Sequence, residues 1–222
     1  MKKIGIVLIV ALVSAGGLFA QDGILRESRG QVEVKLPNAS QWSDAQSGMV
    51  LPRGTTISTG FQSSALIALG ESLITVRPLT RLSLEQIAAQ GREEQVSLSL
   101  QAGQIRASVK KPEGGNVDFT VRSPSATASV RGTEFEMNTL QAWLYEGMLL
   151  FAGLGFEDLA VLLYSGDYSS IDLSGLASSP YWEQILALIT SLPIGTSLAN
   201  LDFGQITLPE VPEATVDIGV EW

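Results

Sequence analysis

The sequence FTVRSPSATASVRGTEFEM, residues 119–137, decides the fold of this chain. On both sides of Gly132, small or apolar residues alternate with polar ones, and these positions are Ala126, Ala128, Val130, Thr133, Phe135 and Met137. A period of two is typical of a strand with one buried face. A glycine between two such runs permits a bulge or the close approach of another backbone. The stretch therefore predicts two consecutive strands joined by a tight connection.

Short stretches of the same alternating kind precede this segment. The strands that they predict cover residues 31–36, 55–59, 64–69, 73–76, 81–85, 96–100, 104–109 and 117–122. Glycines and prolines separate these stretches and indicate turns. Many short strands at close spacing favour an all-β fold of stacked strands, as in a β-sandwich, a β-roll or a solenoid-like stack.

A Leu-x-x-Gly pattern recurs beside the predicted strands. Four of its copies are Leu51 with Gly54, Leu100 with Gly103, Leu144 with Gly147, and Leu163 with Gly166. We expect each leucine to end an inward-facing run and each glycine to permit the turn that follows.

Residues 139–164 are strongly apolar, but Glu146, Glu157 and Asp158 interrupt them. Because carboxylates are costly in the middle of a bilayer, this run does not predict a membrane span. We expect two or three core strands around a connection at residues 153–158. An apolar run of this length also leaves homo-oligomerisation open.

The residues after 171 differ in pattern and predict a small C-terminal extension. Apolar residues recur at helical spacing between Pro180 and Leu192, which predicts one amphipathic helix that packs on the β domain. Alternation over residues 216–222 predicts a final strand.

The N-terminal residues have the layout of a signal peptide. Lys2 and Lys3 precede an uncharged apolar stretch that ends at Ala20, a small residue suited to a cleavage site. The chain is thus expected to contain a signal peptide at 1–20, a β domain at 21–171 and an extension at 172–222. We expect export to the periplasm or the cell surface, with no membrane span after cleavage. The alternative is that the apolar stretch stays attached as an anchor.

Composition excludes several classes of function. The chain has no histidine and no cysteine, so a Ser-His-Asp triad, a Cys-His pair and ordinary structural zinc sites are ruled out. We therefore expect no cofactor and no metal. With 14 basic and 23 acidic residues, the net charge is −9, which repels nucleic acid and anionic lipid.

Because histidine and cysteine are absent, carboxylates are the catalytic groups that we consider. Glu134 and Glu136 stand two positions apart on one predicted strand, at a spacing near that of inverting glycosidases. No aromatic platform for a sugar lies beside them in the sequence, and such pairs are usually solvated surface. We therefore expect a protein that is not an enzyme, with a carboxylate-based glycoside hydrolase as the less favoured alternative. Arg131 is expected to pair with Glu134 or with another carboxylate across the turn.

Three motifs make residues 24–171 similar to the FecR domain family. They are Gly-Thr-x-Ile-x-Thr-Gly at 54–60, Leu-x-x-Gly-x-Ile-Arg at 100–106, and Val-x-Ser-Pro-x-Ala-x-Ala-x-Val-Arg-Gly-Thr-x-Phe at 121–135. The residues that carry the resemblance, as fold-forming or partner-contacting positions, are Gly54, Thr59, Gly60, Gly103, Arg106, Pro124, Arg131, Gly132, Thr133 and Phe135.

The resemblance implies a stacked β domain of the cell envelope. The best-known FecR-like proteins are anti-sigma regulators with a cytoplasmic segment, a membrane helix and a periplasmic domain. Only Met1–Lys3 precede the apolar stretch here, so we expect no cytoplasmic sigma-binding segment. The leading hypothesis is a non-catalytic envelope module that binds another protein or a cell-wall glycan through strand edges or loops. The alternative is a periplasmic component of a signal-transduction system.

Overall fold

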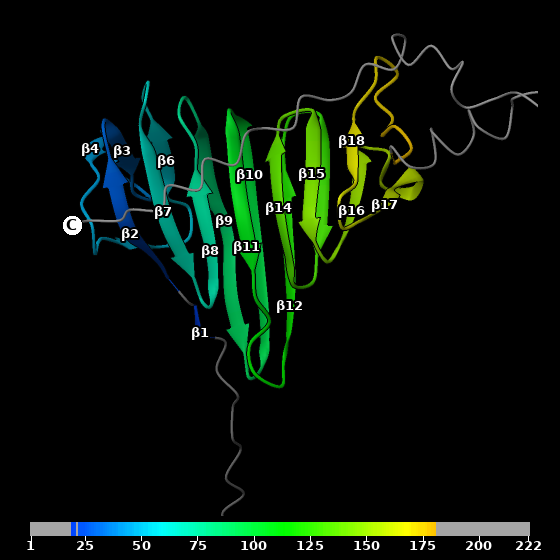
Figure 1. Ribbon diagram of the computed structural model, residues 1–222. Coiled ribbons are helices and arrows are strands. Elements are labelled where there is room, and N and C mark those ends of the chain that lie inside the picture. Colours follow the sequence, from blue (N-terminus) through cyan, green and yellow to red (C-terminus); the bar gives the residue numbers. More distant parts are fainter. Residues whose placement is uncertain (1–18, 21, 181–222) are drawn as a thin grey trace, which may run out of the picture.

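The computed structural model describes residues 19–20 and 22–180, which fold as two facing β-sheets (Figure 1). In order across sheet A, the strands are β17 (Val161–Tyr164), β16 (Met148–Gly153), β13 (Ala126–Val130), β12 (Asn116–Arg122), β10 (Glu93–Ala102), β9 (Arg81–Gln90), β6 (Thr56–Thr59), β3 (Val32–Lys35) and β4 (Ser43–Asp44), with β1 (Phe19–Ala20) beside β9. In sheet B the order is β18 (Tyr168–Ser170), β15 (Gln141–Glu146), β14 (Thr133–Asn138), β11 (Gln104–Val109), β8 (Ser72–Val76), β7 (Ser64–Leu69), β2 (Gly23–Arg29) and β5 (Val50–Leu51). One 3₁₀ turn, η1 (Glu157–Leu159), joins β16 to β17.

The prediction of an all-β, stacked fold is confirmed. Apart from β1 beside β9 and β4 and β5 at one end, both sheets add strands in chain order, so the sandwich grows in one direction along its length. Neighbouring strands are antiparallel except β10 and β12. That pair is parallel because the chain leaves β10 for β11 in the other sheet and then returns in the original direction.

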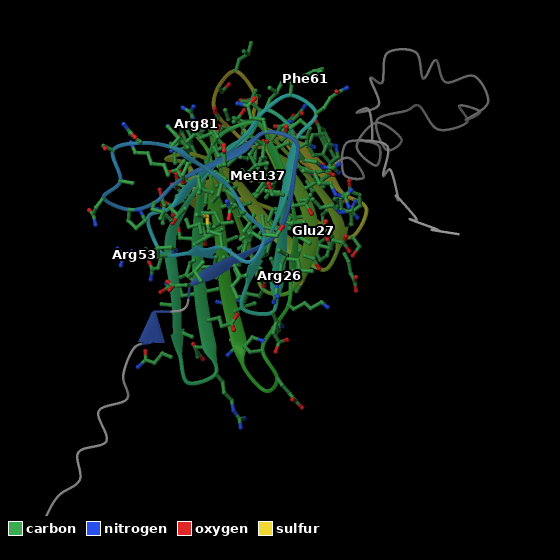
Figure 2. All side chains as sticks on the ribbon, turned by 90° about the vertical axis from the view of Figure 1, so that its left-hand side faces the viewer. Arg26, Glu27, Arg53, Phe61, Arg81 and Met137 are labelled. Atoms are coloured by element: carbon green, nitrogen blue, oxygen red, sulfur yellow. The ribbon has the colours of Figure 1, made fainter. Side chains whose placement is uncertain are left out.

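The core is a single layer of apolar side chains between the sheets. Alternate residues of each strand enter it, and Phe119, Phe135 and Phe151 are the largest of its fully buried side chains. Figure 2, which looks along the sandwich from the β4 end, shows Met137 between the two layers and Arg26, Arg53 and Phe61 at the outside.

The Leu-x-x-Gly pattern has the structural meaning expected of it. The leucines of the four copies named above are buried, with exposures between 0% and 2%. Their four glycines all have positive φ, at 88°, 83°, 96° and 92° in chain order, a conformation that other residues rarely adopt. Leucine thus anchors the strand in the core and glycine makes the turn.

Several strands differ from their predicted bounds. β9 and β10 are ten residues long each and extend past the predicted 81–85 and 96–100, because their polar distal halves still pair with one another. β2 was not predicted, since a register shift between Leu25 and Glu27 breaks its period of two. The apolar run at 139–164 forms the three strands β15, β16 and β17.

The helix predicted at 180–192 and the final strand at 216–222 lie outside the described residues, as does most of the predicted signal peptide. Within the described part, Phe19–Ala20 pair with Ala88 and Ala89 of β9. No helix in that part is both long and apolar enough to cross a membrane. The chain continues past β18 across the end of the sandwich, where Ile171 forms a bridge with Ala177.

Candidate functional site

The first two motifs meet at Thr80, in the loop that connects sheet B to sheet A. Thr59 is buried, donates its hydroxyl to the carbonyl of Arg77 at 2.6 Å and accepts the N–H of Thr80 at 3.0 Å. The Thr80 hydroxyl accepts the N–H of Gln104 at 3.0 Å. A side chain at Gly103 would collide with Thr80, so this glycine is required by the close approach of the loop.

Most other motif residues also hold the backbone in place. Gly54 donates its N–H to Leu84 at 2.6 Å, and Gly60 donates to Gln31 at 2.8 Å. Gly132 has a φ of 90°, and the buried Thr133 donates its hydroxyl to Met148 at 3.0 Å.

Phe135 lies fully buried in the core. Its ring contacts Phe119 edge-on, with the ring centroids 6.4 Å apart and an interplanar angle of 77°. Together with the backbone contacts above, this places seven of the ten motif residues in fold-forming positions.

Arg131 and Pro124 are exposed, but Arg131 does not make the expected ion pair with Glu134. The Glu134 carboxylate instead accepts two hydrogen bonds from Arg106, from Nε at 3.1 Å and from Nη2 at 2.6 Å. Within residues 22–180, Arg131 lies within 4 Å of no carboxylate. The prediction was wrong because Arg106 of β11, which is 28 positions from Glu134 in the chain but on the adjacent strand of the sheet, supplies the partner instead.

Arg106 belongs to a row of side chains that crosses the outer face of sheet B. The register aligns Arg106 of β11 with Glu136 of β14, Trp143 of β15 and Tyr168 of β18. Side chains at paired positions project from the same face, so these four stand side by side. We call this row, together with Arg77, Gln104, Glu134 and Tyr145, the sheet B cluster.

Glu136 is the centre of the sheet B cluster. Its side chain is 1% exposed, although it belongs to the outer face. One carboxylate oxygen accepts hydrogen bonds from Arg77 at 3.0 Å and Gln104 at 2.8 Å, and the other accepts the Tyr145 hydroxyl at 3.0 Å. The expectation of a solvated glutamate is therefore wrong for Glu136, because long side chains from neighbouring strands cover it.

Aromatic rings surround this carboxylate, which the local sequence does not reveal. The rings of Trp143 and Tyr168 lie 5.4 Å apart at 43°, and the Arg106 guanidinium lies 4.5 Å from the centroid of Tyr145. The indole N–H of Trp143 is buried without a hydrogen-bond partner in the described residues. The sequence signal that could have revealed these aromatic side chains is the alternation within QAWLYE, residues 141–146. Ala142 and Leu144 face the core, so Trp143 and Tyr145 face outward.

The electrostatics of the cluster favour a neutral Tyr145. Burial raises the pKa of its phenol to about 12, and the charge and hydrogen bond of Glu136 act in the same direction. Arg106 and Arg77 oppose this rise. The Glu136 carboxylate acts as a structural anchor, because it accepts hydrogen bonds from Arg77, Gln104 and Tyr145 and so fixes one arginine, one glutamine and one tyrosine at the surface.

A second surface lies at the end of sheet A. Met148 is paired with Tyr164 and Leu150 with Leu162, and all four side chains are exposed by 39% to 59%. They form an apolar patch beside β17, the last strand of the sheet. Among the described residues, no group of acidic side chains is placed to hold a metal ion.

Comparison with known proteins agrees with the motifs. Residues 55–149 match the model of the family described as FecR protein, so this part of the chain is similar to a FecR domain. The part matched includes β6 to β15, with the Thr80 junction and most of the sheet B cluster. No curated protein matches the chain.

Two solved structures are similar, both of a candidate anti-sigma factor from Parabacteroides distasonis. The crystal structure at 1.65 Å resolution is 14% identical, has a TM-score of 0.44 and is matched over 61% of this chain and 65% of its own. The one at 2.50 Å resolution is also 14% identical, with a TM-score of 0.42 and coverage of 61% and 64%. The chain thus spans slightly less than two thirds of each.

Proposed function

We propose that this protein is a non-catalytic recognition module of the cell envelope, which binds another protein through the sheet B cluster. The observation that supports this best is the partly exposed set of Arg77, Arg106, Trp143, Tyr145 and Tyr168 around one buried carboxylate. Tryptophan, tyrosine and arginine dominate the binding energy of protein interfaces. Because neighbouring strands hold these side chains in place, little conformational entropy is lost when a partner binds.

The composition of the cluster supports binding over catalysis. A general base needs a carboxylate oxygen that can reach a substrate, whereas Glu136 is buried under three donors. Glu134 is held by Arg106 in a two-point contact. Neither histidine nor cysteine is present to replace them.

Site-specific crosslinking in cells tests the proposal. A photoreactive phenylalanine at Tyr168 should form an adduct with a discrete protein, and Arg106→Ala should abolish this adduct. The matched control carries the same group at Trp42, which is 37% exposed and belongs to neither the cluster nor its strands. Absence of an adduct at position 168, or adducts of equal yield at both positions, would count against the proposal.

A cell-wall glycan is the second candidate ligand, because the Trp143 and Tyr168 rings could contact a sugar. Sedimentation with purified sacculi distinguishes it from a protein partner. If the glycan is the ligand, wild-type protein will cosediment and the Trp143→Ala, Tyr168→Ala double variant will not, whereas a protein partner predicts no cosedimentation of either.

Export is part of the proposal and rests on the layout of residues 1–20. Mass spectrometry of the protein recovered from the periplasm should give an N-terminus at Gln21. A chain that retains residue 1 and stays with the membrane fraction would indicate an anchor.

A signal-transduction role is the alternative function, and the FecR domain is the feature that favours it. Deletion of the gene should then alter transcription under envelope stress or iron limitation. An unchanged transcriptome would leave the recognition module without a signalling role.

A further inference from the structure

Exposed apolar side chains gather at one end of the sandwich. Eight of the fifteen large apolar side chains that are exposed in the described part of the chain lie within residues 148–173. These residues form β16, β17, β18 and the loops between them, and Figure 1 shows the three strands together at one end. In residues 22–180 no strand follows these three, and the terminal units of stacked folds need a cap of their own.

Four of these side chains form one continuous surface on the outer face of sheet A. Met148 pairs with Tyr164, and Leu150 pairs with Leu162, so the four stand two by two on adjacent strands. Their exposed fractions lie between 39% and 59%. A groove of about 470 Å³ lies beside them, between β16 and β17 on one side and β12 and β13 on the other. We call the four side chains and this groove the sheet A patch.

The described part of the chain ends close to the sheet A patch. Ser178 donates its N–H to the carbonyl of Ser170 in β18 at 2.8 Å, and its own carbonyl accepts the Ser169 hydroxyl at 2.7 Å. Pro180 is the last described residue, and the sequence continues to residue 222. The segment after Pro180 therefore starts beside the end strand of sheet B, and the patch lies on the end strands of the facing sheet.

The sequence of that segment is suited to cover an apolar surface. Residues 184–201 contain no charged side chain. The apolar stripe predicted above, from Trp182 to Leu192, occupies one face of a helix and is about 15 Å long at about 1.5 Å per residue. The six residues of β16 extend over about 20 Å. The stripe and the patch therefore have similar lengths.

We propose that residues 181–192 cap the sandwich by packing their apolar stripe on the sheet A patch. Two packed sheets lie about 10 Å apart, and the seven residues from Ser178 to Ile185 cover about 10 Å even in a helix. Ile185 thus reaches the level of sheet A, and Ile189 and Leu192 contact Leu150 and Leu162. Neither apolar surface is then left in water.

The tether favours this segment over a second copy of the chain. A short linker gives a binding segment an effective concentration in about the millimolar range. A second copy has no tether, and the net charge of −9 on each chain opposes association. The groove carries one arginine and one aspartate, Arg131 and Asp118, so it does not repel the single carboxylate of residues 181–192, which is Glu183.

The cap has a consequence for assembly. An uncovered apolar patch beside the edge strand β17 would permit chains to associate at this end, and the cap blocks that contact. The sheet B cluster lies on the other sheet, so the inference does not depend on the proposed function.

Thiol protection tests the cap, because the full chain has no cysteine and one can be placed at a chosen position. Leu162→Cys places a thiol in the patch. Leu73→Cys on β8 is the matched control, since Leu73 and Leu162 are both 39% exposed. If the cap is open about a tenth of the time, a maleimide should react about tenfold more slowly at position 162 than at position 73.

Substitutions in the stripe identify what protects the thiol. In the Leu162→Cys chain, Ile185→Ser with Ile189→Ser should raise the reaction rate to that at position 73. Val216→Ser with Ile218→Ser removes two apolar side chains outside the stripe and should leave the thiol protected.

Crosslinking gives a second measurement that leaves most of the stripe intact. A short bismaleimide should link position 162 to position 189 within one chain in the Leu162→Cys, Ile189→Cys variant. It should not link the two thiols of the Leu73→Cys, Ile189→Cys variant.

Three results would overturn the proposal. Equal rates at positions 162 and 73, without a crosslink to position 189, would show that the patch is uncovered. Protection that is lost on dilution, or crosslinks between chains, would identify a second copy as the occupant. Protection that persists in the Ile185→Ser, Ile189→Ser variant would assign the cover to another part of the chain.

Discussion

Glu136 and Arg77, which are 59 positions apart in the chain, form an ion pair of 3.0 Å on the outer face of sheet B, with the carboxylate 1% exposed. The arginine side chain is 29% exposed and covers the carboxylate from the loop after β8. The Arg77 backbone carbonyl also accepts the hydroxyl of Thr59 at 2.6 Å, so Arg77 connects the first motif to the residue that directly follows the third.

Removing the buried carboxylate should destabilise the protein. Glu136→Gln leaves Arg77 without its charged partner, and we expect unfolding in urea to require about 2 to 3 kcal/mol less free energy. Glu134→Gln is the matched control, because that carboxylate is 35% exposed and should cost below about 1 kcal/mol. Equal losses in both variants would show that Glu136 has no special structural role.

Tyr145 should make stability depend on alkaline pH. Its folded-state pKa of about 12 exceeds the value near 10 expected when unfolded, so the neutral phenol is favoured by folding. Its contribution is fully present below pH 10 and is lost as the pH rises from 10 through 12. In the Tyr145→Phe variant, stability should not show this dependence on pH. The variant should also lack one phenol that ionises late in an alkaline titration, and absorbance at 295 nm will detect this difference. The prediction would be contradicted if both proteins showed the same increase in phenolate absorbance above pH 11, because the phenol that the variant lacks would then ionise at lower pH.

Gly103 should be intolerant of any side chain. Its φ is 83°, and an added Cβ would lie 2.5 Å from the Thr80 Cα. We expect Gly103→Ala to cost about 3 kcal/mol, from the backbone conformation and from the collision. At Gly91, where φ is 63° and nothing lies within 4 Å, alanine should cost about 1 kcal/mol. Chemical denaturation of both variants measures the loss of unfolding free energy. If alanine at Gly91 is as destabilising as alanine at Gly103, the collision with Thr80 is not the cause of the loss at Gly103.

Glu94 and Glu71 should oppose folding at neutral pH. Burial, and then the charge of Glu71, raise the pKa of Glu94, so folding favours its protonated form. This contribution is present below the unfolded pKa of about 4.3 and is lost as the pH rises through the folded value. Glu71→Gln should therefore raise the melting temperature at pH 7 more than at pH 4. Glu113→Gln, on an exposed loop, is the control, and equal shifts at both pH values would contradict the coupling.

The fold was largely predictable because alternation along a strand is a local property. The bounds of β7 and β11 follow directly from their alternating residues, and the turns follow from glycines whose positive φ confirms the Leu-x-x-Gly pattern. β2 escaped prediction because its bulge at Leu25 and Glu27 depends on its pairing with β7. The lengths of β9 and β10 depend likewise on each other, since polar residues beyond the core remain in strands through their cross-strand hydrogen bonds.

The candidate site was only partly predictable. The motifs and the spacing of carboxylates indicated Arg106, Glu134 and Glu136 as candidates. Arg77 was not indicated, because it lies between predicted strands. Trp143 and Tyr145 were expected to belong to strands of an apolar core. Alternation shows which residues share a face of one strand. It does not show which strands are neighbours, and a side chain on the outer face is buried or exposed according to what those neighbours contribute.

By itself, the sequence determined that this is an all-β protein with motifs similar to those of the FecR family, no thiol or imidazole chemistry and a core of alternating aliphatic and aromatic side chains. Tertiary structure alone decided that Glu136 is buried under Arg77 and Tyr145 and that Thr80 joins the first two motifs. The physical reason is that hydrophobic periodicity acts over a few residues, whereas ion pairs and contacts between aromatic rings require the order of strands in two sheets, which residues far apart in the chain determine together.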